Sequence, residues 1–166
     1  MESNAILAVI PHLRRYARAM LVDRAAADDL VQDTLERAWS RFAQLRTGSD
    51  MRAWMFGIMH NLRIDQLRRP ALNTRPIEEE DFEMPTRPNQ TDKLEVRDLA
   101  SALQQLPDEQ REVLLLVALE EMPYAEIAAT LEIPVGTVMS RLSRGRERLR
   151  IIMQSQLQST KLRVVR

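Results

Sequence analysis

The chain has 166 residues, 45% of them hydrophobic, a formal net charge of +0 and no cysteine. This length holds one medium domain or two small ones, and the apolar fraction is enough to build a hydrophobic core. The composition excludes disulfides and thiolate chemistry, and the balanced charge argues against a protein that coats nucleic acid non-specifically.

Apolar residues that recur every three or four positions predict an all-α protein, because glycine and β-type alternation are both scarce. Three amphipathic helices are predicted in the first part of the chain, over residues 5–21, 27–42 and 51–69. The apolar stripe of the second helix is predicted to contain Ala27, Leu30, Val31, Leu35, Ala38, Trp39 and Phe42. Asp23 and Asp50 stand where they can cap the second and third helices, since a short polar side chain accepts hydrogen bonds from the first turn. These helices form the first predicted module, residues 1–69.

Residues 70–92 differ in character, since they hold four of the eight prolines and the acidic run from Glu78 to Asp81. Such a segment buries too little apolar surface to offset the entropy of ordering it, so we expect a flexible acidic linker. Four further helices are predicted over residues 94–106, 108–121, 123–131 and 135–156. The expected architecture is therefore two small helical domains, 1–69 and 93–166, joined by this linker.

The segment from Pro123 to Arg150 has the pattern of a helix-turn-helix. In its second helix Val138 and Leu142 can pack back on the first, while the opposite face carries short polar and arginine side chains. Such residues read base edges and phosphates in a DNA major groove. The alternative is an ordinary α-hairpin with a solvated arginine face, which is disfavoured because the unpaired arginines would repel one another without phosphates.

No catalytic or metal centre is predicted. The chain lacks a glycine-rich phosphate loop and a nucleophile motif, and His12 and His60 are far apart with no ligand-like spacing. We therefore expect no enzyme activity, no cofactor and no metal. No apolar run reaches the ~20 residues that cross a bilayer, and Glu2 stands where a secretory signal is basic, so a cytoplasmic protein without membrane insertion is predicted.

The stretch YAEIAATLEIPVGTVMSRLSRGRERLR resembles the fourth conserved region of the extracytoplasmic-function (ECF) sigma factors, which belong to the sigma-70 family. DDLVQDTLERAW and MRAWMFGIMHNLRIDQLRR resemble their second conserved region. The resemblance covers nearly all of the chain except the linker and the two ends. It implies a subunit that directs core RNA polymerase to specific promoters, controlled by an anti-sigma factor in a stress response.

The resemblance also implies contacts for particular residues. The first module is expected to dock on the β′ clamp of core polymerase through Asp28, Asp29, Gln32, Asp33 and Glu36. The −10 element is expected to meet Asn61, at a pocket for a flipped base, and Arg63, Gln66, Arg68 and Arg69. The duplex −35 element is expected to meet Thr137, Met139, Ser140, Arg141, Ser143, Arg144 and Arg146. The β flap of the polymerase is a further expected contact, and the free chain is expected to be a monomer.

Four features leave more than one interpretation open. Glu132 stands before the recognition helix where the family often has glycine, and Met139 stands where a basic residue is frequent. The first departure bears on the shape of the turn and the second on the base preference. The acidic stripe can also be a solvated helix face, and Trp54 and Phe56 suit either a core or a base-stacking platform.

Two other functions fit parts of the pattern. A regulator that used only the helix-turn-helix would bind palindromic DNA as a symmetric dimer, but the chain shows no heptad pattern or dimer seam. A sigma-like decoy for a regulator of sigma factors would be expected to lose the arginines of the last helix, which this chain keeps.

Overall fold

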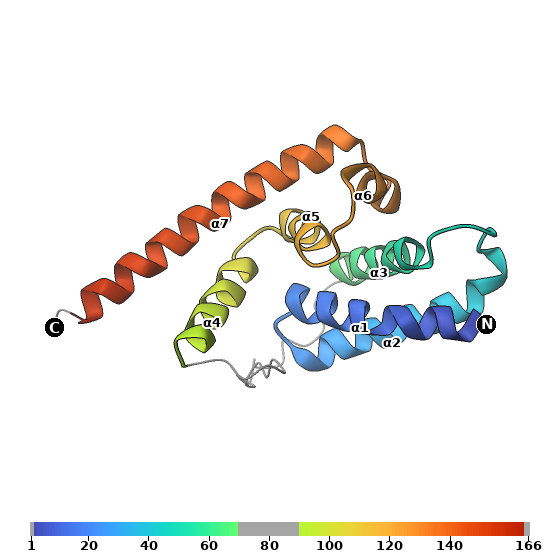
Figure 1. Cartoon of the computed structure of the whole chain (residues 1–166), viewed down its shortest axis with the longest axis horizontal. Helices are drawn as coiled ribbons and strands as arrows, with labels where there is room; N and C mark the ends of the chain where they lie inside the picture. The colour runs from blue at the N-terminus through green and yellow to red at the C-terminus, as the bar shows by residue number, and fades with distance from the viewer. Residues whose placement is uncertain (1, 70–89, 165–166) are drawn as a thin grey trace.

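A computed structural model of the chain describes residues 2–69 and 90–164, and all regular structure in these residues is helical (Figure 1). The elements are α1 (Glu2–Met20), α2 (Arg24–Arg41), the 3₁₀ turn η1 (Phe42–Gln44), α3 (Met51–Arg68), α4 (Gln90–Gln104), α5 (Asp108–Ala118), α6 (Tyr124–Leu131) and α7 (Val135–Val164). The predicted all-α class is confirmed. The acidic run at residues 78–81 lies outside the described residues.

Helices α1, α2 and α3 pack together as the N-terminal module, which we define as residues 2–69. Both predicted caps are confirmed. The Asp23 side chain accepts a hydrogen bond from the Ala25 amide at 3.0 Å, and Asp50 accepts one from the Arg52 amide at 2.9 Å. These bonds satisfy amide donors that a helix start leaves without partners, which explains why α2 and α3 begin where they do.

Helices α4 to α7 form the C-terminal module, residues 90–164, in which α4, α5 and α6 all contact α7. Glu132 joins α6 to α7 in the left-handed region, with φ 55° and ψ 47°, and the Ile133 amide donates to the Ala128 carbonyl at 3.0 Å. The turn is therefore the one that glycine usually makes, held by a glutamate at a cost of about 1 kcal/mol. The departure at this position does not change the shape of the turn.

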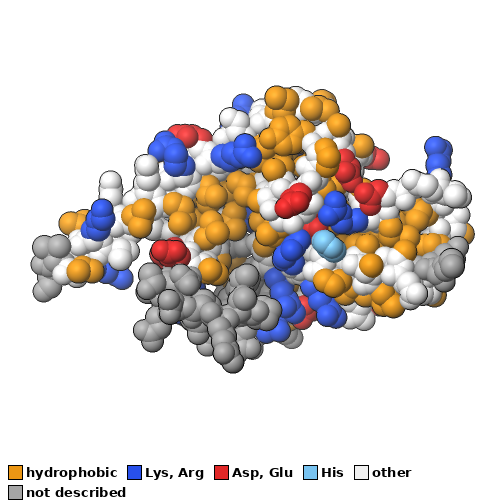
Figure 2. All heavy atoms as spheres, in the orientation of Figure 1, with side chains coloured by type: hydrophobic (Ala, Val, Ile, Leu, Met, Phe, Trp, Pro, Cys, Tyr) orange, Lys and Arg blue, Asp and Glu red, His pale blue; other side chains and the backbone are white. Residues whose placement is uncertain are grey.

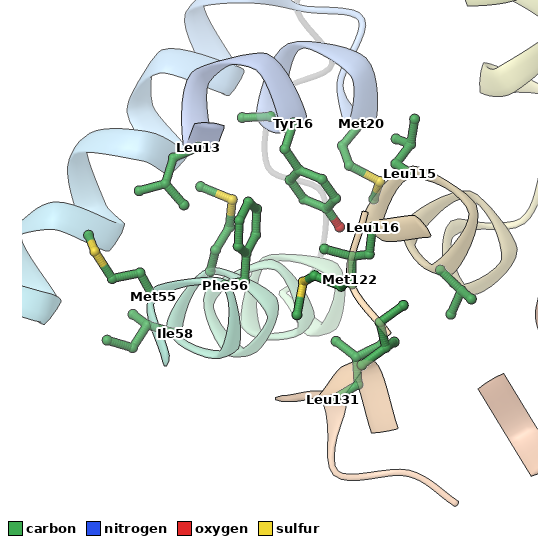
Figure 3. Close-up of a cluster of buried hydrophobic side chains, with 14 of the residues drawn as sticks. Leu13, Tyr16, Met20, Met55, Phe56, Ile58, Leu115, Leu116, Met122 and Leu131 are labelled. Atoms are coloured by element: carbon green, nitrogen blue, oxygen red, sulfur yellow. The ribbon is translucent and has the colours of Figure 1, made fainter. Parts of the chain in front are cut away.

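The two modules pack directly against each other, α1 against α4 and α5, and α3 against α6. Tyr16 of α1 and Phe56 of α3 meet edge to face, with ring centroids 5.1 Å apart. Figure 3 shows these rings facing Leu116 and Met122 of the C-terminal module. The buried apolar side chains thus form one continuous core, and the sequence pattern, which predicted two modules joined by a linker, made no prediction about a contact between them.

Candidate nucleic-acid and protein interfaces

The first turns of α7 carry the residues predicted to read DNA. Val138 and Leu142 are buried beneath them, which anchors this part of α7 against the rest of the module. On the outer face the exposed side chains are Met139, Ser140, Ser143, Arg144 and Arg146. Thr137 and Arg141 are half-buried, and Arg141 lies 3.6 Å from Glu109 of α5. The helix therefore presents an exposed face of the kind that enters a major groove, with Arg141 turned toward its own module.

Tyr124 contributes to this face and was not predicted. It begins α6, is 37% exposed, and lines a shallow groove with Met139, Ser143 and Arg146. Further along the groove, Arg150 donates to Glu147 at 2.6 Å, which lowers the pKa of Glu147 and raises that of Arg150. The only sequence signal for Tyr124 was an aromatic residue at the first position of the first helix of the motif.

The predicted −10 residues lie along the second half of α3 and just after it. Asn61, Arg68 and Arg69 are exposed and Gln66 is half-buried. Arg63 differs, because its guanidinium lies 3.2 Å from Asp108 of the C-terminal module. The structure therefore leaves most of this set open to solvent but engages one member in the contact between modules.

The aromatic residues of α3 belong to the core. Phe56 is 2% exposed, and Trp54 is half-buried and packed against the same cluster. The structure therefore places Phe56 inside the core and packs Trp54 against it, which favours the core interpretation for both.

The acidic stripe of α2 faces solvent. All five of its predicted docking residues are exposed, namely Asp28, Asp29, Gln32, Asp33 and Glu36. Beside them Trp39 is 65% exposed, although the sequence pattern placed it on the buried stripe of this helix. That placement was wrong because Ala38 already occupies the buried line, and one further residue turns the side chain about 100° away from it. A large exposed aromatic beside a charged stripe is typical of a protein-binding surface.

The contact between modules contains ion pairs that sequence reasoning missed. Glu120, at 1% exposure, contacts His12 at 2.8 Å, Arg15 at 3.0 Å and Arg52 at 3.7 Å. Glu112 contacts His60 at 2.6 Å. Figure 2 shows basic side chains, acidic side chains and a histidine gathered at the boundary between the modules. No spacing in the sequence could reveal these pairs, since the partners lie 52 to 108 residues apart.

Other buried polar groups lie at the same boundary. Arg111 is 5% exposed and donates to Asp108 at 2.5 Å, and burial lowers the pKa of its guanidinium. Burial also raises the pKa of the Tyr16 hydroxyl well above its ordinary value, and the carboxylates of Glu112 and Asp108 add to this shift. The boundary is therefore a charged surface in which Glu120, Glu112 and Arg111 are buried, while the Arg15 side chain stays about half exposed.

Within residues 2–69 and 90–164, no helix is both long and apolar enough to cross a membrane. The same residues contain no cluster of three side chains able to hold a metal ion.

Comparison with known proteins places each module in a family. Residues 6–60 match the family described as Sigma2 domain of PhyR, and residues 97–149 match Sigma-70, region 4. The chain is 37% identical over 153 residues to the ECF RNA polymerase sigma factor EcfG of Rhodopseudomonas palustris (strain TIE-1), covering 89% of this chain and 82% of that protein. It is 36% identical over 149 residues to SigL of Mycobacterium tuberculosis (strain ATCC 25618 / H37Rv), covering 86% and 82%.

Two solved structures resemble most of the chain. The sigma factor RpoE of Bartonella quintana, in complex with the anti-sigma factor NepR, is 32% identical and superposes with a TM-score of 0.76 over 92% of this chain and 96% of its own. CnrH, in complex with the cytosolic domain of CnrY, is 29% identical, with a TM-score of 0.64 over 86% and 80%. One superposition spans both modules in each case, so their relative placement is similar as well.

Proposed function

The chain belongs to the ECF sigma factors of the sigma-70 family, and from this premise we propose how its modules divide the work of promoter recognition. As a member of the family it is a non-enzymatic subunit of transcription initiation. We propose that residues 1–69 bind core polymerase and the −10 element, that residues 93–166 bind the −35 element, and that residues 70–92 link them. The observation that carries this division is the exposed polar face of α7 over its buried anchors Val138 and Leu142.

At the −35 element, Ser140 and Arg144 are proposed to contact base edges. Arginine makes bidentate hydrogen bonds to guanine in the major groove, and a serine hydroxyl can donate or accept. Met139 can offer only an apolar contact, for instance to a thymine methyl group. Arg146 and the other exposed arginines of α7 are proposed to bind phosphates, which supply affinity without sequence preference.

At the −10 element, Asn61 is proposed to bind a base that has left the stack. Its amide can hydrogen-bond a base edge, and the neighbouring cations can bind the backbone on either side. Those cations are Arg63, Arg68 and Arg69, and the neutral amide of Gln66 is proposed to donate to the backbone beside them. Capture of an unstacked base only in the open promoter offsets the loss of stacking, which is a few kcal/mol per step.

The acidic stripe of α2 is proposed as the docking surface for the β′ clamp of core polymerase. Its five polar residues are all exposed, and Trp39 beside them adds an apolar anchor of the kind that dominates binding energy at protein interfaces. The C-terminal module is proposed to contact the β flap. Both contacts would take place in the cytoplasm, where the polymerase transcribes.

Control by an anti-sigma factor is proposed for this chain as well. Its support is the similarity to RpoE and CnrH, which were solved in complex with NepR and with the cytosolic domain of CnrY. The inducing condition is proposed to be a stress. The free chain is proposed to be a monomer.

Run-off transcription tests the proposed function directly. Purified core polymerase is mixed with a genomic promoter library, with and without the chain. We expect new start sites that share a spaced −35 and −10 pair and that weaken on Asn61→Ala or Arg144→Ala substitution. Arg46→Ala, in an exposed loop of the N-terminal module, is the matched control and should leave the starts unchanged.

The contrary result is equally clear. No binding to core polymerase and no new start sites, together with a footprint by the protein alone on a palindrome, would assign the chain to the ordinary regulators that use only a helix-turn-helix.

A further inference from the structure

A shallow groove runs beside the proposed DNA-reading face of α7. Its apolar lining comes from Tyr124, the first residue of α6, and from Met139 and Leu142 of α7. Leu142 is 2% exposed, whereas Met139 is 54% and Tyr124 37% exposed, so the groove has one buried and two accessible apolar side chains. The polar residues that complete the lining lie further along α7 and are Ser143, Arg146, Glu147 and Arg150.

Met139 is an unusual residue for a DNA-reading position. Between residues 137 and 146 it is the one large apolar side chain that the described structure leaves exposed, because Val138 and Leu142 are buried. A methionine cannot pair with a phosphate, and its sulfur is only a weak hydrogen-bond acceptor for a base edge. Its exposed side chain also adds little to the core. Met139 therefore suits a ligand that is itself apolar.

The order of the lining along α7 matches the order of chemistry across a duplex. In a helix-turn-helix, the N-terminal residues of the recognition helix contact base edges in the major groove. Met139 lies early in α7, and Arg146 lies seven residues later (from 139 to 146), which is roughly 10 Å further along the axis. Spacings of four and seven residues keep Met139, Ser143 and Arg146 on one side of the helix. An apolar contact at a base and a cation at the backbone can thus form together.

The cation of the groove is Arg146. Arg150, further along, donates to both carboxylate oxygens of Glu147 at 3.1 and 2.6 Å, so its charge is already matched. Arg146 is exposed and makes no ion pair within residues 2–69 and 90–164. Its guanidinium is therefore the lining group that is available to a phosphate.

One group that a duplex presents in its major groove is apolar. Guanine, adenine and cytosine offer hydrogen-bond donors and acceptors there, whereas thymine adds its C5-methyl group. This methyl group is the one difference between thymine and uracil, and between 5-methylcytosine and cytosine, and it leaves the Watson–Crick hydrogen bonds unchanged. Burying it between a thioether and an aromatic ring is worth ~0.8 kcal/mol, or roughly a fourfold gain in affinity. An apolar pocket in the groove would therefore detect the methyl group itself.

We propose that Tyr124 and Met139 form a pocket for the C5-methyl group of one pyrimidine in the −35 duplex. The ring of Tyr124 and the thioether of Met139 contact the methyl group, and Arg146 binds a neighbouring phosphate. This inference rests on the proposed −35 role of α7 and adds Tyr124 to the residues that determine specificity. It also makes recognition depend on DNA modification, because a −35 element with cytosine at this position is bound more tightly after cytosine-5 methylation.

A scan of the pyrimidine methyl groups in the −35 element tests the pocket. Promoter fragments from the run-off experiment are made with each thymine replaced by uracil, or each cytosine by 5-methylcytosine, one at a time on both strands. Every base pair contains one pyrimidine, so the scan covers the whole element. Polymerase carrying the native chain should respond at one base pair, binding roughly fourfold more weakly without the methyl group or roughly fourfold more tightly with it. A scan in which no base pair responds overturns the proposal.

Variants of the chain assign the response to the groove. Met139→Ala and Tyr124→Ala should each remove most of the difference, while Tyr124→Phe should keep it, because the ring and not the hydroxyl contacts the methyl group. Ile151→Ala, which shortens an exposed apolar side chain of α7 outside the groove, is the matched control and should keep the difference. A response that survives Met139→Ala would come from the shape of the DNA, and one that Tyr124→Phe abolishes would come from the hydroxyl. Either result overturns the proposal.

The two proposals fail in different ways. New start sites without any methyl response leave the sigma function standing and remove the pocket. The reverse result is an absence of new start sites, together with a methyl response when the chain alone binds duplexes selected from a random library. It removes the promoter function and keeps the methyl-reading groove.

Discussion

The Glu126 side chain of α6 is unfavourably placed at the boundary between the two modules, beside Asp50 of the N-terminal module. Burial raises its pKa, and the carboxylate of Asp50, at the start of α3, raises it further, while Arg52 opposes the shift. Its Oε1 atom has no hydrogen-bond partner in the described part of the chain. A group with a raised pKa in the folded state binds its proton more tightly there than in the unfolded chain, so folding loses stability as pH rises through the raised pKa.

Glu126→Gln should therefore raise the thermal unfolding midpoint at neutral pH, because the amide carries no charge to oppose Asp50. The advantage over the native chain should grow as pH rises from about 4 to about 7. Glu132→Gln, exposed at the end of the same helix, is the control in the same melting series. A lower midpoint for Glu126→Gln at neutral pH would show that the carboxylate is favourably bound.

Arg144 and Arg146 are neighbours on α7 but are expected to differ in what they bind. Arg144→Ala should cost about 1–3 kcal/mol at a cognate −35 duplex and relax the preference at one base pair. Arg146→Ala should weaken all duplexes alike and reduce the salt slope by about 1. Fluorescence anisotropy with cognate and mutated duplexes separates the two. The assignment would be reversed if Arg146→Ala, and not Arg144→Ala, relaxed the base preference.

The exposure of most side chains predicted to lie on the outer face of α7 could be anticipated from the sequence, because the helical period decides which side chains face out. Trp39 and Arg63 could not. Trp39 was misplaced because helical period alone does not say how wide a strip the neighbouring helices cover. Arg63 was assigned to phosphates, and only the packing of α5 against α1 brings Asp108 within 3.2 Å of it.

Sequence pattern located all seven described α-helices but not every end, and it did not predict the 3₁₀ turn η1. Helix α4 begins at Gln90 instead of residue 94, and α7 continues to Val164 instead of residue 156. The residues before 94 have the polar composition of a turn, yet Thr91 and Asp92 are also well suited to the first turn of a helix. Nothing in the sequence after 156 breaks a helix, so the end of α7 could not be read from local preference.

The two glycines of α7 should respond in opposite ways to a larger side chain. A Cβ at Gly136 would meet nothing within 4 Å, whereas a Cβ at Gly145 would meet Gln110 Cβ and its carbonyl oxygen at 3.4 Å. Gly136→Ala should therefore stabilise the protein by about 0.5–1 kcal/mol. Gly145→Val should destabilise it by about 1–3 kcal/mol, because α5 must move to admit the extra atoms. Urea unfolding measures both, and a stable Gly145→Val variant would mean that α5 and α7 separate easily.

At the level of the whole molecule, the shared core is the feature that local sequence cannot predict. Each module would need buried apolar residues to form a core even if it folded alone. The residues that meet in the shared core are Tyr16, Phe56, Leu116 and Met122. Whether they face a partner module depends on pairings between distant parts of the chain, and helical period carries no information about those. The two-module organisation was therefore predictable, while their closure was not.

The shared core should make the modules unfold together. Leu116→Ala removes a side chain that is 1% exposed in the C-terminal module and should cost about 2–5 kcal/mol. Both tryptophans, Trp39 and Trp54, belong to the N-terminal module, so their fluorescence reports the other half of the chain. In Leu116→Ala, the unfolding midpoint measured by tryptophan fluorescence should fall together with the midpoint measured by helical circular dichroism.

Leu149→Ala, on α7, is the control for the shared core. It should lower the midpoint by less, because Leu149 is only partly buried. Unchanged tryptophan fluorescence in Leu116→Ala, alongside an earlier loss of helical signal, would mean that the modules unfold independently.

The position of Glu120 in the chain also sets an order of events during translation. Arg63, which pairs with Asp108 across the module boundary, is synthesised 57 positions (from 63 to 120) before Glu120, which pairs with His12, Arg15 and Arg52 of the N-terminal module. At roughly 5–20 residues per second, a ribosome takes roughly 3–11 s to cover this distance. For that interval the nascent N-terminal module carries its cations without their carboxylates, close to ribosomal and messenger RNA. We therefore expect the nascent N-terminal module to attract polyanions most strongly before Glu112 and Glu120 have been synthesised and have folded against it.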